Sequence, residues 1–437
     1  MKSGKYTERR KLSAGTVFML VLLVVVLTGS ALVLGRLSSG ARVDLSKLNM
    51  NVLDLSSDDT PDKAGSAQGE SSASASRPET AAAAAPAPTA APAGRNEFTL
   101  TAGGSISLSG EVRKNSKSTD AKVADYADVM MLLAPRINAD VNIVFLENIL
   151  SDKHKVSDSV APAQASALLK EAGFGMAACG FSQAYAAGKD GVEETLMNLD
   201  SRGVGALGIR YADDPGRPEV RTVGGMRTAF LQYTATVPAK TRKSMEKEET
   251  TDMVPEADLD LITQDIDAAR KEGAEAVIVL LSWGRTGKDP DKAQRELAEG
   301  IAAAGADLII GNGSHVPQTA EYLTGVNGRS VLCVWSLGTL LDGDRSNIKR
   351  MSGYLLHVTI RSDGQGGALI LNPEYTPVYT WKYKQDGRYY YRCIATDGSE
   401  PDGMDAEQRK AMAKSAETVA AVLKDAPVSA REQSNGP

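Results

Sequence analysis

The sequence predicts an α/β protein in which a parallel or mixed sheet is covered on both faces. Two continuous apolar runs, "AVIVLLS" (276–282) and "ADLIIG" (306–311), are typical of strands buried on both sides. The segment between them, "DKAQRELAEGIAAAG" (291–305), is predicted to be a helix, and Asp289 and Asp291 at its start complement the helix dipole. Buried strands that alternate with helices indicate a sheet with helices on both faces.

The region before these strands supplies further elements of the same kind. We expect strands at "FTLTAGG" (98–104), "VNIVFLE" (141–147) and "GMAACG" (175–180), and helices at "ALLKEAGF" (167–174) and "GVEETLMNLDSRG" (191–203). Gly203 is expected to end the last of these as a C-cap. The segment "EVRTVGGMRTAFLQYTA" (219–235) predicts a hairpin around Gly224 and Gly225.

The second half continues the pattern. Leu261, Ile262, Ile266 and Ala269 recur at helical spacing in residues 260–274, which predicts an amphipathic helix. Residues 353–372 predict a closing antiparallel hairpin, on which His357 is a strand-face residue. Residues 239–258 are highly charged and lack a periodic apolar face, so a solvated surface loop is expected, with a lid as the alternative.

The C-terminal part is expected to add a hairpin, a helix and a tail. "YKQDGRYYYR" (383–392) predicts a tyrosine-rich hairpin around Asp386-Gly387, with a contact to a polyanion as the alternative reading. Residues 405–424 have helical periodicity. The last residues, 429–437, are expected to be disordered.

The N-terminal part predicts a membrane anchor. Residues 12–35 carry no charge, and 24 helical residues span about 36 Å, which exceeds a hydrocarbon core of about 30 Å. Five basic residues and one acid precede this stretch, so the positive-inside rule puts the N-terminus in the cytoplasm and the rest outside the cell membrane. A cleaved signal peptide is the alternative.

These observations divide the chain into five parts. They are a cytoplasmic N-terminus (1–11), a transmembrane helix (12–35), a disordered linker rich in Ala, Pro and Ser (36–96), the main α/β domain (97–380) and the C-terminal hairpin, helix and tail (381–437).

The amino-acid composition limits the binding partners and metal ligands that the chain can be expected to use. A formal net charge of −6 gives no broad basic surface for nucleic acid. The chain has three histidines, so any metal chemistry would rest mainly on carboxylates. The three cysteines are far apart and odd in number, which argues against a disulfide framework; Cys179 and Cys333 stand in apolar runs and are expected to be buried.

Motifs at the predicted strand ends, where open α/β sheets bind ligands, carry a resemblance. In order along the chain they are "TAGG" (101–104), "FLE" (145–147), "GFGMAACGFSQAYAAGKDG" (173–191), "SWG" (282–284), "GNGSHVPQ" (311–318) and "SLGT" (336–339). Over residues 97–378 this order resembles the CapA family of capsule or poly-γ-glutamate biosynthesis proteins. The resemblance implies a metallophosphatase-like fold, here a layered α/β sandwich with mixed sheets.

The departures from that family fall on the residues that would hold metal. Where the resemblance implies donors, this sequence has Gly104, Phe181, Ser182, Gln183, Ala186, Ser282, Thr286, Gly313 and Thr339. Glu147, His315 and Gln318 are retained. One carboxylate and one imidazole are too few for a tight divalent site. The resemblance therefore implies the framework of a metal site whose family-type divalent metal is lost, so no cofactor is expected.

The ligand-binding candidates are Glu147, His315, Gln318 and Ser282. Glu147 is read either as a former ligand or general base, or as a strand-end acid bonded to backbone. His315 is read as an anion-binding or acid–base group, or as a loop histidine held by a carbonyl. Ser282 lacks a GxSxG motif and a paired base, so a structural serine is favoured over a nucleophile.

Three functional hypotheses remain open. The first is a membrane-anchored, extracytoplasmic CapA-like pseudoenzyme that binds or positions an anionic surface polymer. The second is an active metal-dependent hydrolase or transferase that uses Glu147, His315 and other donors. The third is a non-catalytic scaffold for envelope assembly proteins. The membrane is a predicted partner in all three.

Overall fold

The computed structural model of this chain describes residues 96–115, 126–214, 218–398 and 400–431. The predicted anchor and almost all of the predicted linker lie outside the described residues. No helix within the described ranges is both long and apolar enough to cross a membrane.

The larger of two main sheets is mixed. In spatial order it contains β16 (Arg388–Ala395), β15 (Ala368–Gln385), β14 (Ser352–Ser362), β1 (Glu97–Ile106), β2 (Val141–Leu146), β5 (Met176–Ala178) and β6 (Gly205–Leu207). Two short strands join it at the side, β13 (Thr339–Leu341) on β1 and β17 (Ser429–Ala430) on β15. β1, β2, β5 and β6 run parallel, and β14, β15 and β16 are antiparallel to their neighbours. We call this the large sheet.

The second sheet, called the small sheet, has parallel strands at its centre and hairpins at its edges. Its order is β11 (Ala320–Thr324), β12 (Ser330–Val334), β10 (Leu308–Asn312), β9 (Ala276–Ser282), β8 (Met226–Thr234) and β7 (Val220–Val223). β8, β9, β10 and β12 are parallel. Apart from both sheets, β3 (Ile149–Leu150) pairs with β4 (Val160–Ala161).

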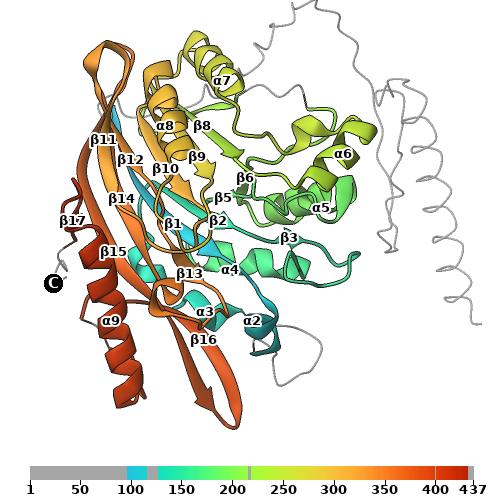
Figure 1. The fold of residues 1–437 in the computed structure, drawn as a ribbon, viewed down its shortest axis with the longest axis vertical. Coiled ribbons are helices and arrows are strands. Elements are labelled where there is room, and N and C mark those ends of the chain that lie inside the picture. Colours follow the sequence, from blue (N-terminus) through green and yellow to red (C-terminus); the bar gives the residue numbers. More distant parts are fainter. Residues whose placement is uncertain (1–95, 116–125, 215–217, 399, 432–437) are drawn as a thin grey trace, which may run out of the picture. The chain divides into compact units, whose positions relative to one another are not determined.

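Helices complete the layers, as Figure 1 shows. α2 (Gly110–Asn115), α3 (Ala127–Met130), α4 (Ser166–Glu171), α5 (Gly188–Asp200) and α6 (Ala239–Glu248) contribute buried residues to a core on the outer face of the large sheet. α7 (Leu259–Lys271) and α8 (Lys292–Ala304) cover the outer face of the small sheet. α9 (Ala406–Val422) packs on β14 and β15. Short 3-10 turns lie at η2 (Ala134–Arg136), η3 (Ala163–Ala165), η4 (Thr251–Met253), η5 (Val326–Gly328) and η6 (Ile348–Met351).

The two sheets face each other across a shared apolar core. Leu100 and Ile143 of the large sheet and Ile278, Leu280 and Ile310 of the small sheet belong to this one buried cluster. The order of layers is therefore helix, sheet, sheet, helix. The predicted layered α/β sandwich with mixed sheets is confirmed.

Most of the predicted elements are present. All the predicted strands and the hairpins around Gly224 and Asp386 form. The predicted helix at 291–305 begins with Asp291 in a capping box with Gln294 and ends at Gly305 in a left-handed conformation. Cys179, Cys333 and Cys393 are buried free thiols.

Three expectations need correction. Residues 239–258 contain α6 and η4 instead of a solvated loop, because Met245 and Met253 insert into the large-sheet core. Leu261 does not belong to the buried face of α7, since it is 37% exposed while Ile262 is buried. The start of the tail is ordered, because Ser429 and Ala430 pair with β15.

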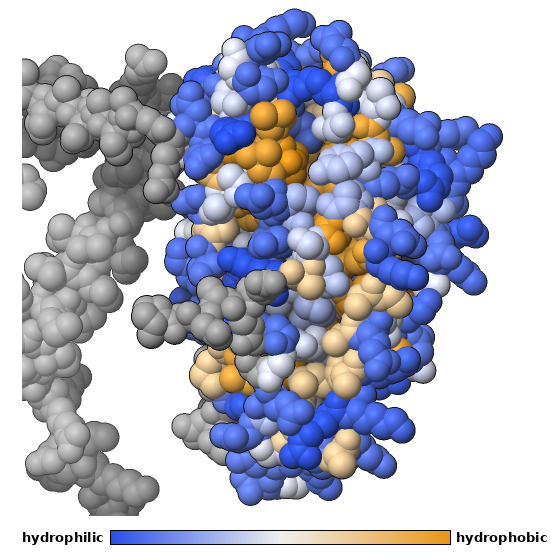
Figure 2. Space-filling view, turned by 90° about the vertical axis from the view of Figure 1, so that its left-hand side faces the viewer, coloured by the Kyte–Doolittle hydropathy of each residue, from blue (hydrophilic) through white to orange (hydrophobic). Residues whose placement is uncertain are grey.

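The expected boundary at 380 falls inside the continuous strand β15, so the C-terminal hairpin is part of the same sheet. The surface on the side shown in Figure 2 is largely hydrophilic, with apolar patches at its top and along its middle.

A buried carboxylate joins the two sheets. Asp307, just before β10, is 2% exposed and accepts hydrogen bonds from Arg270 at 2.6 Å and Arg329 at 2.9 Å. It also accepts backbone N–H groups of Val277 in β9 and Ala368 in β15, at 2.8 and 3.0 Å. Asp307 thus links the small sheet to the large sheet.

We expect Asp307→Asn to lower the free energy of unfolding by about 3–5 kcal/mol, because it removes the buried counter-charge of Arg270 and leaves Arg329 with Asp363 alone. Chemical denaturation measures this. The control is Glu296→Gln, which removes an exposed ion pair with Lys292 and should change stability by less than about 1 kcal/mol. A loss below about 1 kcal/mol for Asp307→Asn would show that Asp307 does not hold the sheets together.

His357 of β14 is a buried neutral histidine. Its side chain is within 3.0 Å of Thr101 and Thr376 and within 2.8 Å of Arg431. Burial, with the positive charges of Arg431 and Arg136, lowers the pKa of His357 from 6.5 to about 3. Between these two values the unfolded chain binds a proton that the folded chain does not.

The stability that this histidine contributes is therefore complete above pH 6.5 and is lost as the pH falls toward 3. From this group alone, unfolding at pH 5 should require about 2 kcal/mol less than at neutral pH. Denaturation of His357→Gln at both pH values should show a dependence that is shallower by that amount. Equal pH dependence in the variant and the wild type would refute this assignment.

Candidate functional site: a cleft at the strand ends

A cleft of about 180 Å³ opens where strands of both sheets end. Its lining residues lie at or just after the ends of β2, β5, β8, β9 and β10: Glu147, Phe181, Ser182, Thr234, Thr236, Ser282, Trp283, Gly284, Thr286, Gly313 and His315. The carboxyl ends of these strands meet here because the strands run parallel within each sheet.

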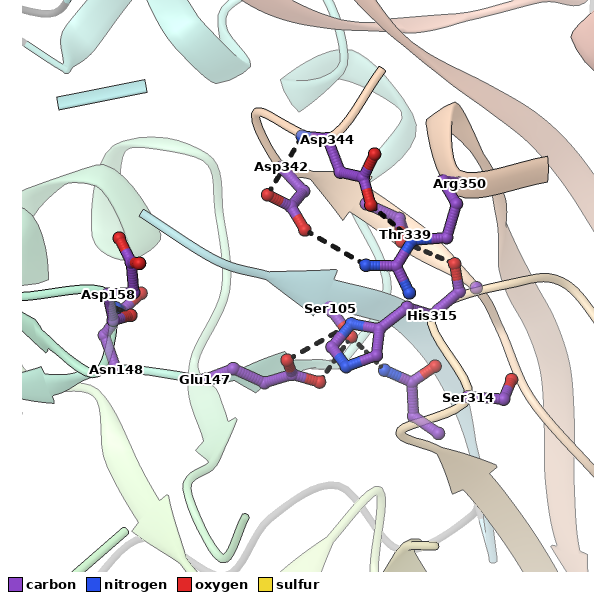
Figure 3. A network of polar contacts seen from close by, with 12 residues as sticks. Ser105, Glu147, Asn148, Asp158, Ser314, His315, Thr339, Asp342, Asp344 and Arg350 are labelled. Carbon is purple, nitrogen blue, oxygen red and sulfur yellow. Dashed lines mark hydrogen bonds and ion pairs between the residues drawn. The ribbon is translucent and has the colours of Figure 1, made fainter. Parts of the chain in front are cut away.

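Glu147 and His315 are the ionisable pair of the cleft. Glu147 Oε2 lies 3.3 Å from His315 Nδ1, and the two side chains are 15% and 22% exposed. Figure 3 shows them pointing toward one another. The next residue, Asn148, fixes the loop after β2, because it accepts the Leu108 N–H at 2.7 Å and donates to the Asp158 carbonyl at 3.0 Å.

A chain of buried polar groups supports Glu147 from behind. Ser105 donates to Glu147 Oε1 at 2.6 Å and accepts from the Asn312 side-chain amide at 2.6 Å. Ser336 donates to Asn312 Oδ1 at 3.2 Å and accepts from Ser314 at 3.0 Å. The last four side chains are at most 1% exposed. Since every group has a partner, this chain fixes the carboxylate rigidly.

His315 sits in an unusual backbone conformation. Its φ is +57°, in the left-handed region that residues other than glycine rarely adopt. The Thr339 hydroxyl donates to the His315 carbonyl at 3.1 Å and holds this turn. Strain of this kind is typical of functional sites, because it sets the direction of one side chain.

A charged cluster stands beside the cleft in the loop after β13. Arg350 donates to Asp344 at 2.9 Å and lies 3.9 Å from Asp342. Hydrogen bonds from Ser346 and the charge of Arg350 lower the pKa of Asp344, so this carboxylate stays ionised and paired. Figure 3 places the cluster near His315.

The structure brings together most of the positions singled out in the sequence. Seven of them line this one cleft: Glu147, Phe181, Ser182, Ser282, Thr286, Gly313 and His315. Ser282 accepts a hydrogen bond from Gln232 at 3.3 Å. Gln318 does not line the cleft; it is 3% exposed and donates to the Lys288 carbonyl at 2.5 Å.

Sequence reasoning missed Thr234 and Thr236. The signal was available, because "AFLQYTATV" (229–237) precedes the β9 segment and could have been placed beside it in the sheet. The buried partners Ser105 and Asn312 carried no such signal. Their roles depend on contacts between strands that are 207 residues apart.

The cleft does not fit a two-metal centre. Its lining offers one carboxylate and one imidazole beside hydroxyl, aromatic and backbone groups. No group of three His, Cys, Asp or Glu side chains within the described parts of the chain is arranged to hold a metal ion. A divalent site with an open position needs at least three protein donors.

Two backbone contacts occupy space that donors would need. A Cβ atom at Gly104 would lie 2.2 Å from the Gly338 carbonyl oxygen. At Gly313, where φ is +111°, a Cβ atom would lie 2.7 Å from the Trp283 carbonyl oxygen. The resemblance implies an aspartate at position 104 and a histidine at position 313, and neither side chain is compatible with this backbone.

Comparison with known proteins identifies the family. The family model described as "Bacterial capsule synthesis protein PGA_cap" matches residues 99–344, more than half of the chain. The chain therefore belongs to the bacterial capsule synthesis protein family, and the resemblance to CapA proteins is confirmed.

A curated relative is "PGA biosynthesis protein CapA" of Bacillus subtilis (strain 168), which is 25% identical over 202 residues. That match covers 46% of this chain, and the chain spans about half of the relative's length.

Two solved structures match this chain weakly. One is a putative 5'-nucleotidase from Staphylococcus aureus in complex with alpha-ketoglutarate, with a TM-score of 0.38, 11% identity, and coverage of 74% of this chain and 58% of that one. The other is the calcineurin-like phosphoesterase YfkN from Bacillus subtilis, with a TM-score of 0.39, 11% identity, and coverage of 75% and 99%. Scores at this level carry no conclusion about the site.

We expect Gly104→Asp and Gly313→His each to lower the free energy of unfolding by at least about 2 kcal/mol, because the added side chains must displace backbone. Chemical denaturation of the purified variants measures this. Ser182→Asn is the control, since Ser182 is an exposed lining residue, and it should stay within about 0.5 kcal/mol of the wild type. Wild-type stability of both glycine variants would show that the backbone leaves room for the former donors.

Proposed function

We propose that this chain takes part in the synthesis of a capsule or poly-γ-glutamate-type surface polymer by binding or positioning the anionic polymer in the cleft. In this proposal the protein is a pseudoenzyme of metallophosphatase-like ancestry. Membership of the capsule synthesis family supports the polymer class. The observation that carries the proposal is the cleft lining, in which hydroxyl groups surround one Glu–His pair.

The chemistry of the lining suits a polyamide that carries carboxylates. Hydroxyl groups of Ser182, Thr236 and Thr286 can donate to carboxylate and amide oxygens, and Glu147 can accept an amide N–H. His315 adds a second hydrogen-bonding side chain beside Glu147. A pocket that pairs each polar group of a ligand discriminates strongly against ligands that lack those groups.

The location is part of the proposal, and the N-terminal sequence supports it. Residues 12–35 would anchor the chain in the cell membrane, and residues 36–96 would hold the α/β domain outside the cytoplasm. At that position the cleft could meet a growing polymer and the envelope proteins that assemble it.

One observation favours a second candidate function. The Glu147 carboxylate lies 3.3 Å from His315 Nδ1, within ion-pair distance but without a hydrogen bond, and a small movement would give the carboxylate–imidazole pair of a general acid–base site. An active hydrolase or transferase would use this pair to move a proton at the substrate. A third candidate, a scaffold without a cleft ligand, has no specific observation in its favour.

Titration of the full-length chain with poly-γ-glutamate tests the proposal. We expect saturable binding that weakens at least about tenfold in Glu147→Gln and in His315→Ala, because His315→Ala removes a hydrogen-bonding ring and Glu147→Gln removes the carboxylate beside that ring. His154→Ala is the matched control, since His154 hydrogen-bonds to Ser151 away from the cleft and should bind like the wild type.

The same samples separate the candidates. Cleavage or transfer of the polymer that stops in both cleft variants would favour the acid–base enzyme. Binding that none of the cleft substitutions changes, or no binding at all, would contradict polymer binding in the cleft.

A further inference from the structure

A second concave site lies at the opposite end of the large sheet. Its volume is about 340 Å³, and it shares no lining residue with the cleft. Thr99 and Thr101 of β1 line it and alternate along the strand with Phe98 and Leu100 of the inter-sheet core. Because successive strand residues point to opposite faces, the site is on the outer face of the large sheet. We call it the outer pocket.

His357 forms the fixed floor of the outer pocket. Its side chain is 5% exposed, and its Nδ1 accepts from the Arg431 guanidinium at 2.8 Å and is 3.0 Å from the Thr101 hydroxyl. Arginine can only donate, so Nδ1 is the acceptor of the ring and the proton is on Nε2. Nε2 then donates to the Thr376 hydroxyl at 3.0 Å. The neutral His357 ring is held by Thr101, Thr376 and Arg431, and it fixes the position of the Arg431 guanidinium.

The sheet is distorted beside this floor. β14 and β15 pair through His357 with Glu374 and then through Thr359 with Leu371, so the register shifts between the two pairs. Asn372, within the shifted stretch of β15, has a φ of +48° and lines the pocket. β-bulges and strained residues that are not glycine concentrate at functional sites, because they re-aim neighbouring side chains.

The rim of the outer pocket carries two opposite charges. Arg431 Nε lies 3.8 Å from Glu374 Oε2, and their side chains are 39% and 38% exposed. The other polar lining residues, such as Asn138, Thr359 and Asn372, are uncharged. Of the nearby charged groups, Arg136 is paired with Asp397 at 2.5 Å, and Asp140 accepts from Thr99 at 2.8 Å.

We propose that the outer pocket binds a small zwitterion, such as a free α-amino acid, in which a carboxylate lies next to an ammonium group. Arg431 takes the carboxylate and Glu374 takes the ammonium, while the amides of Asn138 and Asn372 and the hydroxyl of Thr359 hydrogen-bond to the rest. A ligand with a single charge would engage only one of the two rim residues. This inference is independent of the cleft and of its proposed ligand.

Calorimetric titration of the full-length chain with L-alanine, L-serine and L-glutamate tests the proposal. We expect saturable binding of at least one of them, and at least tenfold weaker binding of acetate and of methylammonium at the same ionic strength. Arg431→Gln and Glu374→Gln should each weaken the binding of the amino acid by at least tenfold. Both side chains are partly exposed, so both variants are expected to fold.

Two controls confine the effect to the outer pocket. Arg409→Gln removes an arginine from an exposed ion pair with Glu400 and should bind like the wild type. Glu147→Gln alters only the cleft and should also bind like the wild type. The proposal is overturned if no amino acid binds, if acetate binds as tightly as the amino acid, or if the Arg431 and Glu374 variants retain full affinity.

Discussion

The cleft depends on the close approach of two backbone segments, one at Gly104 in β1 and one at Gly338 before β13. The Ser105 N–H donates to the Gly338 carbonyl at 2.9 Å, and this contact leaves no room for a side chain at position 104. Ser105 is thereby placed to donate to Glu147, and the cleft is left with hydroxyl groups around one carboxylate and one imidazole. The composition of the cleft and the geometry of the backbone therefore depend on the same contact.

The sequence allowed the layers and most of the cleft to be predicted. Apolar strands such as 276–282 alternate with amphipathic helices, and this pattern depends on local periodicity alone. The positions around Glu147, Ser282 and His315 could be placed together because parallel strands end at one edge of a sheet. The family model matches residues 99–344, a range that contains all three of these positions.

Other features could not be predicted, because they depend on tertiary contacts. α6 is highly charged, and only the insertion of Met245 into the core explains why it packs against the body of the protein. Likewise, β17 forms because Ser429 and Ala430 pair with β15. The network from Ser105 to Ser336 and the pairing of Arg431 with His357 join segments that are far apart in the sequence.

We propose that this fold keeps the framework of a metal site without enough donors to hold metal. The direct measurement is the metal content of the full-length chain by mass spectrometry, after equilibration with manganese, zinc and iron and removal of free ions. We predict well below one ion per chain, unchanged by Glu147→Gln and His315→Ala. Two tightly held ions per chain that are lost in those two variants would contradict the account.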